Sequence, residues 1–400
     1  MDRAARFTRL RIVAAFLVPF TIPISTSVSE IVTGAAFVLL AVEGEWSRAL
    51  SSILAKPIVL ASLALFLLLG IGTLYSNVPW PAAAHIWFKY RELIYLPLFM
   101  LLCRDLSAVR AGLLGVYAVV ATIVVLGGAQ WLFGISLAPH PFGTGSVFGS
   151  YIVEGVLTSV TAYYFAQEAV ASRRWRILWS LAAIAAVAYV LCVTPGRTGI
   201  LVAFVMAAIF VFQTAPRRWL VPGLLLIAMF GGGIYRLSPE FNDRVGGIFD
   251  GLKGGDITGA ARSTKTRMEF YRGALETMER SPVFGTGTGS FEKAYWAVAA
   301  DRGLPPTSNP HNEYLMIGVQ IGILGVATML GLLATLWLSA ASLPHADAMR
   351  GRAVTLALAT SCLVNSSMLD HVDSQIFFFQ ISLFFVGILG RDDQRHRNDI

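Results

Sequence analysis

The chain has 400 residues, of which 56% are hydrophobic and only 14% are charged. Soluble domains normally carry about a quarter charged residues, so this composition excludes an ordinary soluble protein. The net charge of +7 would suit a nucleic-acid partner. Much of the basic charge lies in short loops and tails between apolar runs, however, so no nucleic-acid partner is expected.

Long apolar runs, such as 58–74 and 177–193, approach the roughly 20 residues that cross a bilayer. The sequence therefore predicts an all-α polytopic membrane protein with about 12 transmembrane helices. In chain order these predicted spans are 10–27, 29–42, 58–76, 88–102, 109–134, 151–170, 177–194, 198–214, 218–236, 311–342, 353–369 and 374–390. One long polar segment divides the chain into helices 1–9 (1–236), a loop (237–310), and helices 10–12 with a tail (311–400).

The basic residues predict how the chain is oriented. Eighteen of the 31 Lys and Arg residues lie in the termini and short loops of one side, and the opposite short loops (77–87, 135–150 and 368–373) contain none. By the positive-inside rule, both termini are cytoplasmic. The long loop then lies outside the membrane, which in a Gram-negative cell is the periplasmic side of the inner membrane.

The long loop contains a predicted amphipathic helix at 263–279. Its apolar residues recur at spacings of three and four: Met268, Tyr271, Leu275 and Met278. Ser263 or Thr264 is a candidate N-cap, and Glu276 with Arg280 forms an i,i+4 pair. Such a helix can lie on a membrane surface or over a cavity.

A glycine-rich run at 281–291 follows this helix. Its glycines at 285, 287 and 289 resemble a phosphate cradle, but no Lys-Ser/Thr pair follows and no strand precedes them, so a nucleotide site is disfavoured. A turn in which two backbones approach closely is the better interpretation. Glycines at 318, 322, 325 and 331 could likewise bend the tenth span or allow close packing.

Basic side chains at the predicted outer ends of spans are the first functional candidates. Arg197 begins the eighth span, and Lys89 with Arg91 begins the fourth. Charges in such positions are often functional, although snorkelling toward the interface is the alternative. The interpretation favours function for Arg197 and leaves Lys89 and Arg91 open.

Arg197, Arg267 and His311 together predict a chemistry. Guanidinium groups bind phosphate oxygens through paired, charge-assisted hydrogen bonds, and they stabilise negative charge on a departing phosphate. A neutral imidazole can take the proton from an incoming hydroxyl. The three residues are therefore the candidate catalytic set for glycosyl transfer from a lipid diphosphate sugar. Further candidate substrate contacts are Tyr271, Arg272, Lys89 and Arg91.

A metal could replace the guanidinium groups in this chemistry. Asp370, His371 and Asp373 in the last outer loop could hold a divalent ion. Solvated loop polarity is the favoured interpretation, so neither a metal nor another cofactor is expected.

Three motifs carry a resemblance to a known family. They are Gly196-Arg197-Thr198-Gly199, the run 267–272 with its Gly285-Thr286-Gly287 sequel, and 311–315 running into Gly322-Ile323-Leu324-Gly325. In order and spacing they resemble the O-antigen ligase and O-antigen polymerase family over roughly residues 150–340.

The resemblance implies a metal-independent, inverting glycosyltransferase with the all-helical GT-C-like fold of membrane lipid-sugar transferases. Arg197 and Arg267 would hold the diphosphate of an undecaprenyl-diphosphate-linked O-antigen donor, and His311 would serve the acceptor hydroxyl. A ligase, whose acceptor is the lipid A–core oligosaccharide, is favoured. An O-antigen polymerase and a protein O-oligosaccharyltransferase remain alternatives within the family.

Two other classes remain open. A lipid-linked glycan transporter or flippase would suit the number of spans, but transporters usually bind substrate near the midplane of the membrane. Here the polar candidates gather on one face. A non-catalytic envelope scaffold is the remaining class, and it would make the placement of the arginines and the histidine accidental.

Overall fold

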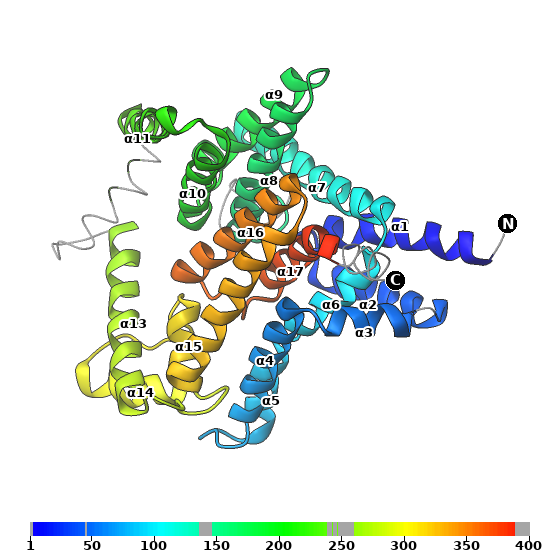
Figure 1. Cartoon of the computed structure of the whole chain (residues 1–400). Helices are drawn as coiled ribbons and strands as arrows, with labels where there is room; N and C mark the ends of the chain where they lie inside the picture. Colours follow the sequence, from blue (N-terminus) through cyan, green and yellow to red (C-terminus); the bar gives the residue numbers. More distant parts are fainter. Residues whose placement is uncertain are drawn as a thin grey trace.

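The computed structural model describes residues 3–44, 46–135, 146–237, 242, 246 and 260–388. These residues form helices joined by turns, with no strand among them (Figure 1). Most of the first part of the long polar loop and the basic residues of the C-terminal tail lie outside the described residues.

The first half of the chain contains eight helices before residue 175 in the described part. They are α1 Arg3–Thr21, α2 Thr26–Glu43, α3 Trp46–Leu54, α4 Pro57–Gly72, α5 Trp80–Phe88, α6 Glu92–Leu102, α7 Leu106–Phe133 and α8 Tyr151–Ala171. The remainder are α9 Arg176–Ala188, the π-helical η2 Tyr189–Val193, α10 Arg197–Thr214, α11 Arg217–Leu237, α13 Ala260–Arg280, α14 Phe291–Arg302, α15 Glu313–Ser339, η3 Ala340–Ser342, α16 His345–Val364 and α17 His371–Phe385.

Several of these helices are long and apolar enough to cross a membrane. Within the described residues there are six: Thr26–Glu43, Leu106–Phe133, Arg176–Val193, Arg197–Thr214, Arg217–Arg236 and Glu313–Ser342. The chain is therefore an all-α, multi-pass membrane protein. Each predicted span overlaps a helix, but the count of about 12 and the GT-C-like architecture stay predictions, because the other helices are shorter or less apolar.

Helix α17 lies in the middle of the bundle and packs against α6, α16 and α7 (Figure 1). Its run Phe377-Phe378-Phe379 is fully or almost fully buried. A helix that is apolar on all sides is stable only when neighbours surround it, so this composition explains its central place. Gln380, a polar residue inside it, accepts a hydrogen bond from Tyr164 Oη at 2.9 Å.

Several helix ends meet around α13 and α14, and we refer to this end of the bundle as the α13 side. Arg197, the first residue of α10, donates to Ser263 and Thr264 of α13. Asn312, the N-cap of α15, donates to the Leu363 carbonyl near the end of α16. These helix ends share one side, as the predicted alternation of the spans requires.

Helix α15 is interrupted at Gly322, which has φ 69° and ψ −160°. The glycine-rich run lies against this break. Thr286 N donates to Val319 O at 2.9 Å, Gly287 N donates to Gln320 O at 2.8 Å, and Ile323 N donates to Pro282 O at 2.8 Å. The expected close approach of two backbones is therefore confirmed, because a broken helix must satisfy its freed amide and carbonyl groups from another segment.

The predicted amphipathic helix corresponds to α13, but two details of the prediction are wrong. The helix begins at Ala260, so Ser263 and Thr264 lie inside it and do not cap it. Their hydroxyl groups instead accept hydrogen bonds from Arg197. Glu276 pairs with Arg302 of α14 at 2.9 Å, which replaces the expected pairing with Arg280.

Helix α14 is absent from the sequence prediction. Its signals were nonetheless present: Glu292 lies in its first turn, Arg302 lies in its last turn, and Gly303 follows with φ 63°. Acidic residues at the start, basic residues at the end and a terminal glycine are the usual boundaries of a helix. Its buried face, which includes Phe291 and Tyr295, packs against α13 and α15.

Candidate functional site

The start of α10 is fixed by close packing against α8. A side chain on Gly199 would come within 2.8 Å of the Gly155 Cα atom, so glycine is required at this crossing. Ser159 Oγ donates to Gly199 O at 2.9 Å, and Thr194 Oγ1 donates to Tyr151 O at 3.2 Å. Within the motif Gly196–Gly199, Gly199 therefore sets the position of Arg197 by allowing α10 to pack closely on α8.

Arg197 reaches from α10 to α13. Its Nη1 atom lies 2.6 Å from Thr264 Oγ1, and its Nη2 atom lies 2.8 Å from Ser263 Oγ. Arg267 follows one helical turn later and lies near enough for the two guanidinium charges to repel each other. The structure therefore brings two like charges together at the α13 side, and an anion between them would remove this repulsion.

Arg267 also faces the loop between α16 and α17. Its Nη1 atom donates to the Val364 carbonyl at 3.3 Å. Among the described residues, the hydrogen bond recorded for this guanidinium goes to a neutral carbonyl group. Arg267 thus keeps its positive charge uncompensated by a directly bonded carboxylate within that part of the chain.

His311 lies immediately before the N-cap of α15 and has an unusual backbone conformation. Its φ of 55° makes it the one non-glycine residue with positive φ in the described part of the chain. Asn309 Oδ1 accepts its backbone N–H at 2.7 Å, and Tyr271 Oη donates to its carbonyl group at 3.2 Å. Such a conformation costs about 1–3 kcal/mol, and residues of this kind cluster at functional sites.

The His311 imidazole is half-buried beside α13. Its ring centroid lies 6.4 Å from that of Phe270. Burial lowers its pKa below the usual 6.5, and the nearby charge of Arg267 lowers it further. A hydrogen bond with Asn365 raises the pKa but does not reverse this shift. The neutral imidazole is therefore favoured at neutral pH, which is the protonation state that a general base requires.

The Nδ1 atom of His311 is buried and has no hydrogen-bond partner within the described ranges. A buried polar atom without a partner costs about 1–3 kcal/mol, so such atoms are rare. This cost adds to that of the left-handed backbone, so the surrounding structure holds His311 in place at an energetic cost.

The loop between α16 and α17 supports the site, a role that no sequence motif predicted. Ser366 Oγ donates to Asn309 Oδ1 at 2.7 Å, which fixes the side chain that holds the His311 backbone. Met368 N and Leu369 N donate to the buried Glu313 carboxylate, which also accepts from Tyr90. The signal that could have identified the loop is the polar run at 365–367 between two apolar helices.

The other predicted contacts with substrate lie in different surroundings. Tyr271 is half-buried, donates to the carbonyl groups of His311 and Leu363, and has a pKa raised by burial, so its hydroxyl stays a donor. Arg272 is exposed on the other flank of α13. Lys89 is half-buried at the C-terminus of α5.

Arg91 belongs to a separate cluster of charges at the starts of α6, α2 and α17. Its Nη2 atom lies 2.8 Å from Glu30 Oε1 and 3.0 Å from His371 Nδ1. The two ring nitrogens of His371 lie 2.5 Å from Glu92 and 2.9 Å from Glu30. These carboxylates compensate Arg91 within the protein, so the structure does not place it beside Arg197 and Arg267 as a contact for phosphate.

The same cluster has distances that would suit a metal. One ligand atom each from Glu30, Glu92 and His371 lie within 4.8 Å of one another. An imidazole that faces a carboxylate at each nitrogen is, however, arranged as a protonated donor, and Arg91 supplies a second positive charge. The two cations and two carboxylates then sum to zero, which disfavours a divalent ion.

The suggested metal run in the last loop does not converge on one point. Asp370 accepts from the Val372 and Asp373 amides as the N-cap of α17. Asp373 is buried and accepts from Asn365 and Ser367, while His371 faces Glu30 and Glu92. The favoured alternative, solvated loop polarity, is also wrong for Asp373, because this side chain is 1% exposed.

Residues 181–330 match the family model described as O-antigen ligase. No curated protein matches the chain. The matched segment contains Arg197, Arg267 and His311, and it agrees with the resemblance drawn from the three motifs.

Proposed function

From the match of residues 181–330 to the family model described as O-antigen ligase, we propose that the protein is an inverting membrane glycosyltransferase and an O-antigen ligase. The donor is O-antigen polysaccharide on undecaprenyl diphosphate, and the acceptor is a hydroxyl group of the lipid A–core oligosaccharide. The observation that carries this proposal is the meeting of Arg197, Arg267 and a neutral His311 at the α13 side.

In the proposed reaction, the His311 imidazole takes the proton of the acceptor hydroxyl. The hydroxyl oxygen attacks the anomeric carbon of the donor sugar from the face opposite the diphosphate. A new glycosidic bond forms as the bond from the anomeric carbon to the phosphate oxygen breaks, and undecaprenyl diphosphate leaves with that electron pair. Configuration at the anomeric carbon is inverted.

Arg197 and Arg267 stabilise the leaving group in this proposal. The diphosphate gains one unit of negative charge as the bond breaks, and fixed guanidinium groups oppose that charge without having to reorient. The same anion also offsets the mutual repulsion of the two guanidinium groups. Tyr271 and Arg272 are assigned to substrate binding along α13, and Lys89 stays a prediction. Arg91 is assigned to the cluster with Glu30, Glu92 and His371.

The proposal places the site on the periplasmic face of the inner membrane, with both termini in the cytoplasm. The skewed distribution of basic residues supports this orientation. Lipid A–core and the finished O-antigen are both membrane-anchored, so a site at the ends of the helices can receive both.

A transfer assay with purified protein tests the function. We expect Arg267→Ala and His311→Ala each to lower transfer of O-antigen to lipid A–core by about 100-fold or more, because each removes a group that acts in the transition state. Arg280→Ala is the matched control, since Arg280 is exposed at the far end of the same helix. Near-normal transfer by both site variants, with normal folding, would remove the proposal.

The same assay tests whether transfer depends on a metal. We expect a chelator to leave transfer unchanged, and loss of activity that a divalent ion restores would instead implicate carboxylates such as Glu30 and Glu92.

A deletion strain distinguishes a ligase from a polymerase. In that strain, free lipid-linked long chains together with bare core would indicate a ligase. Cores that carry single repeats would indicate a polymerase.

A further inference from the structure

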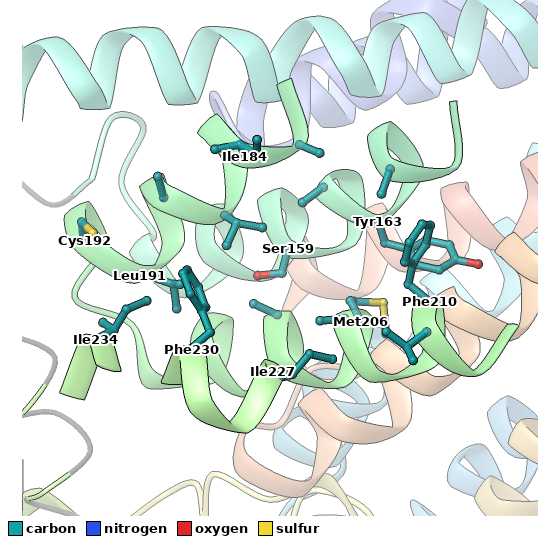
Figure 2. Close-up of a pocket in the computed structure, with 18 residues that line it drawn as sticks. Ser159, Tyr163, Ile184, Leu191, Cys192, Met206, Phe210, Ile227, Phe230 and Ile234 are labelled. Carbon is teal, nitrogen blue, oxygen red and sulfur yellow. The ribbon is translucent and has the colours of Figure 1, made fainter. Parts of the chain in front are cut away.

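An apolar cavity of about 630 Å³ lies between α8, α9, η2, α10 and α11 (Figure 2). Cys192, Leu191 and Ile234 lie at one end of it, and Tyr163 and Phe210 lie at the other (Figure 2). Its long dimension therefore follows the helices.

The cavity wall offers almost nothing to a polar ligand. Its two side chains with hydroxyl groups are bonded within the protein: Ser159 Oγ donates to Gly155 O and Gly199 O, and Tyr163 Oη donates to Gln213. The rest of the lining is aliphatic, aromatic or sulfur-containing. A sugar or a nucleotide would lose hydrogen bonds to water here without replacement, so the ligand must be a hydrocarbon.

Helix α10 joins this cavity to the candidate site. Arg197 is its first residue, and Ala203, Met206 and Phe210 form a stripe on the cavity wall at spacings of three and four. The first of these lies only about 9 Å along the helix from Arg197. One helix therefore presents a cation at its end and an apolar groove directly below it.

The η2 segment brings the cavity still nearer to Arg197. It is a single π-helical turn, closed by a hydrogen bond of 3.1 Å from Thr194 N to Tyr189 O, and it ends just before the turn that begins α10. Leu191 and Cys192 of this turn line the cavity. π-helical turns occur frequently at functional sites, where they redirect side chains.

Helix α11 closes the cavity with one face. Ile227, Phe230 and Ile234 recur at spacings of three and four and line the cavity. Apolar residues elsewhere on α11, such as Leu226 and Met229, are exposed, as on a helix that borders lipid. The cavity thus lies at the edge of the bundle, where a lipid tail can enter from the bilayer.

We infer that this cavity holds the isoprene units nearest the diphosphate of the polyprenyl donor. The inference rests on the proposed function, which places that diphosphate at Arg197 and Arg267. The cavity volume is that of a drug-sized ligand, so it takes the start of the tail and leaves the remainder in the bilayer. A tail held along α10 fixes the distance between the diphosphate and His311. It thereby orients the anomeric carbon of the donor sugar.

Cys192 provides a native reporter of occupancy. It is exposed in the cavity wall, whereas Cys103 and Cys362 are buried. Alkylation of Cys192 by N-ethylmaleimide in detergent-solubilised protein is measured with isopentenyl, farnesyl or geranylgeranyl diphosphate present at equal concentration. We expect protection to increase with chain length, with about tenfold slower alkylation for the longest chain than for the shortest, because longer chains bury more apolar surface.

Two alanines on α9 give matched variants. Ala183 lines the cavity, whereas Ala185 is exposed on the same helix and does not line it. We expect Ala183→Trp to fill the cavity and abolish the dependence on chain length, and Ala185→Trp to retain it. A geranylgeranyl diphosphate that carries a diazirine on its tail gives an independent measurement on the unmodified chain. It should cross-link to peptides that contain Ile227 and Phe230.

The outcomes separate the inference from the proposed function. If prenyl diphosphates bind through Arg197 but protect Cys192 equally at all lengths, or cross-link elsewhere, the cavity assignment fails alone. Equal protection by dioleoyl phosphatidylglycerol would also overturn it, because the cavity would then be a general lipid site. If no prenyl diphosphate binds at any length, the proposed function fails and the assignment fails with it.

Discussion

His311 shows how a single residue can be positioned at an energetic cost. A left-handed backbone conformation is rare for a histidine, and Asn309, Ser366 and Tyr271 together hold it through hydrogen bonds. The ring is thereby directed beside Phe270 and Asn365, with its Nδ1 atom buried and without a hydrogen-bond partner among the described residues. Replacement of Asn309 or Ser366 should therefore lower transfer, although neither residue is assigned to substrate contact.

The pKa of His311 leads to a prediction about pH. A lowered pKa keeps the imidazole neutral to more acidic pH, so its base form is lost only as the pH falls below the usual value of 6.5. We expect Arg267→Gln to raise this pKa, because a nearby positive charge that disfavours protonation is removed. The rate of His311 carbethoxylation against pH, followed by peptide mapping, measures the shift without requiring turnover.

A matched substitution on the same helix serves as the control in that experiment. Arg280→Gln, at the exposed far end of α13, should leave the His311 profile unchanged. A His311 profile that does not move when Arg267 is replaced would show that the two side chains do not interact.

Arg91 illustrates the opposite role, in which a candidate ligand stabilises the fold. It pairs with Glu30 and Glu92, and Glu92 is fully buried. We expect Arg91→Leu to lower the free energy of unfolding by about 3 kcal/mol, because the two carboxylates Glu30 and Glu92 then share the single positive charge of His371. Thermal unfolding in detergent measures the change. Lys89→Leu, two residues earlier, should change stability by less than about 0.5 kcal/mol.

At the scale of elements, α13 is the segment that assembles the site. One face of it meets Arg197 through Ser263 and Thr264, and the next turn presents Arg267 and Tyr271 to the loops around His311. Its buried face includes Ala274, and Met278 lies against Gly318 of α15, whereas Met268 and Leu275 of the predicted apolar stripe are exposed. The helix thus brings parts of α10, α15 and α16 to one place.

The break in α15 makes a second prediction for an element. The φ and ψ of Gly322 are accessible essentially to glycine alone, and a Cβ atom there would lie 2.3 Å from Val283 O. We expect Gly322→Ala to lower the free energy of unfolding by about 1–3 kcal/mol or more, since it also disturbs the glycine-rich run. Differential scanning fluorimetry in detergent would measure it.

The same helix supplies the control for this substitution. Gly331 has no atom within 4 Å of the place that a Cβ would occupy. Gly331→Ala should therefore be neutral or stabilise the protein by up to about 1 kcal/mol, because alanine favours the helix. Equal effects of the two substitutions would contradict the structural role of the break.

At the scale of the whole molecule, the described helix ends alternate between two sides. Those that meet α13 include the starts of α10 and α15 and the end of α16. Charges at the opposite side are paired among neighbouring helices, as for Arg11 with Glu43 and Asp105, and Arg350 with Glu168. The polar candidate site is therefore separated from this second set of charges by the apolar bundle.

Labelling of single cysteines in cells tests the orientation. Glu292 is exposed on α14, so Glu292→Cys in a Cys192→Ser background is a suitable reporter. We expect a membrane-impermeant maleimide added outside the inner membrane to label this position. Ala346→Cys, exposed at the start of α16, should be labelled only after the membrane is opened. The reverse pattern would invert the topology.

The sequence by itself determined the class of the protein and the approximate limits of its apolar helices. These properties are local, because hydropathy and charge along a short segment decide whether it enters a membrane. It also indicated Arg197, Arg267 and His311 as candidates from motifs of a few residues. The glycine-rich run was interpreted correctly for the same reason, since alternating glycines point to a close approach of backbones.

Only the tertiary structure decided which candidates meet. Arg197 and Thr264 are 67 residues apart, and Arg91 and His371 are 280 apart, so no local pattern relates them. Arg91 and Arg197 are both basic residues at the ends of predicted apolar spans. Helix packing nevertheless places Arg91 among carboxylates and Arg197 beside Arg267. Whether a charged side chain is paired within the protein or available to a ligand depends on the groups that the fold brings within a few ångströms. Electrostatic interactions weaken with distance and with solvent screening.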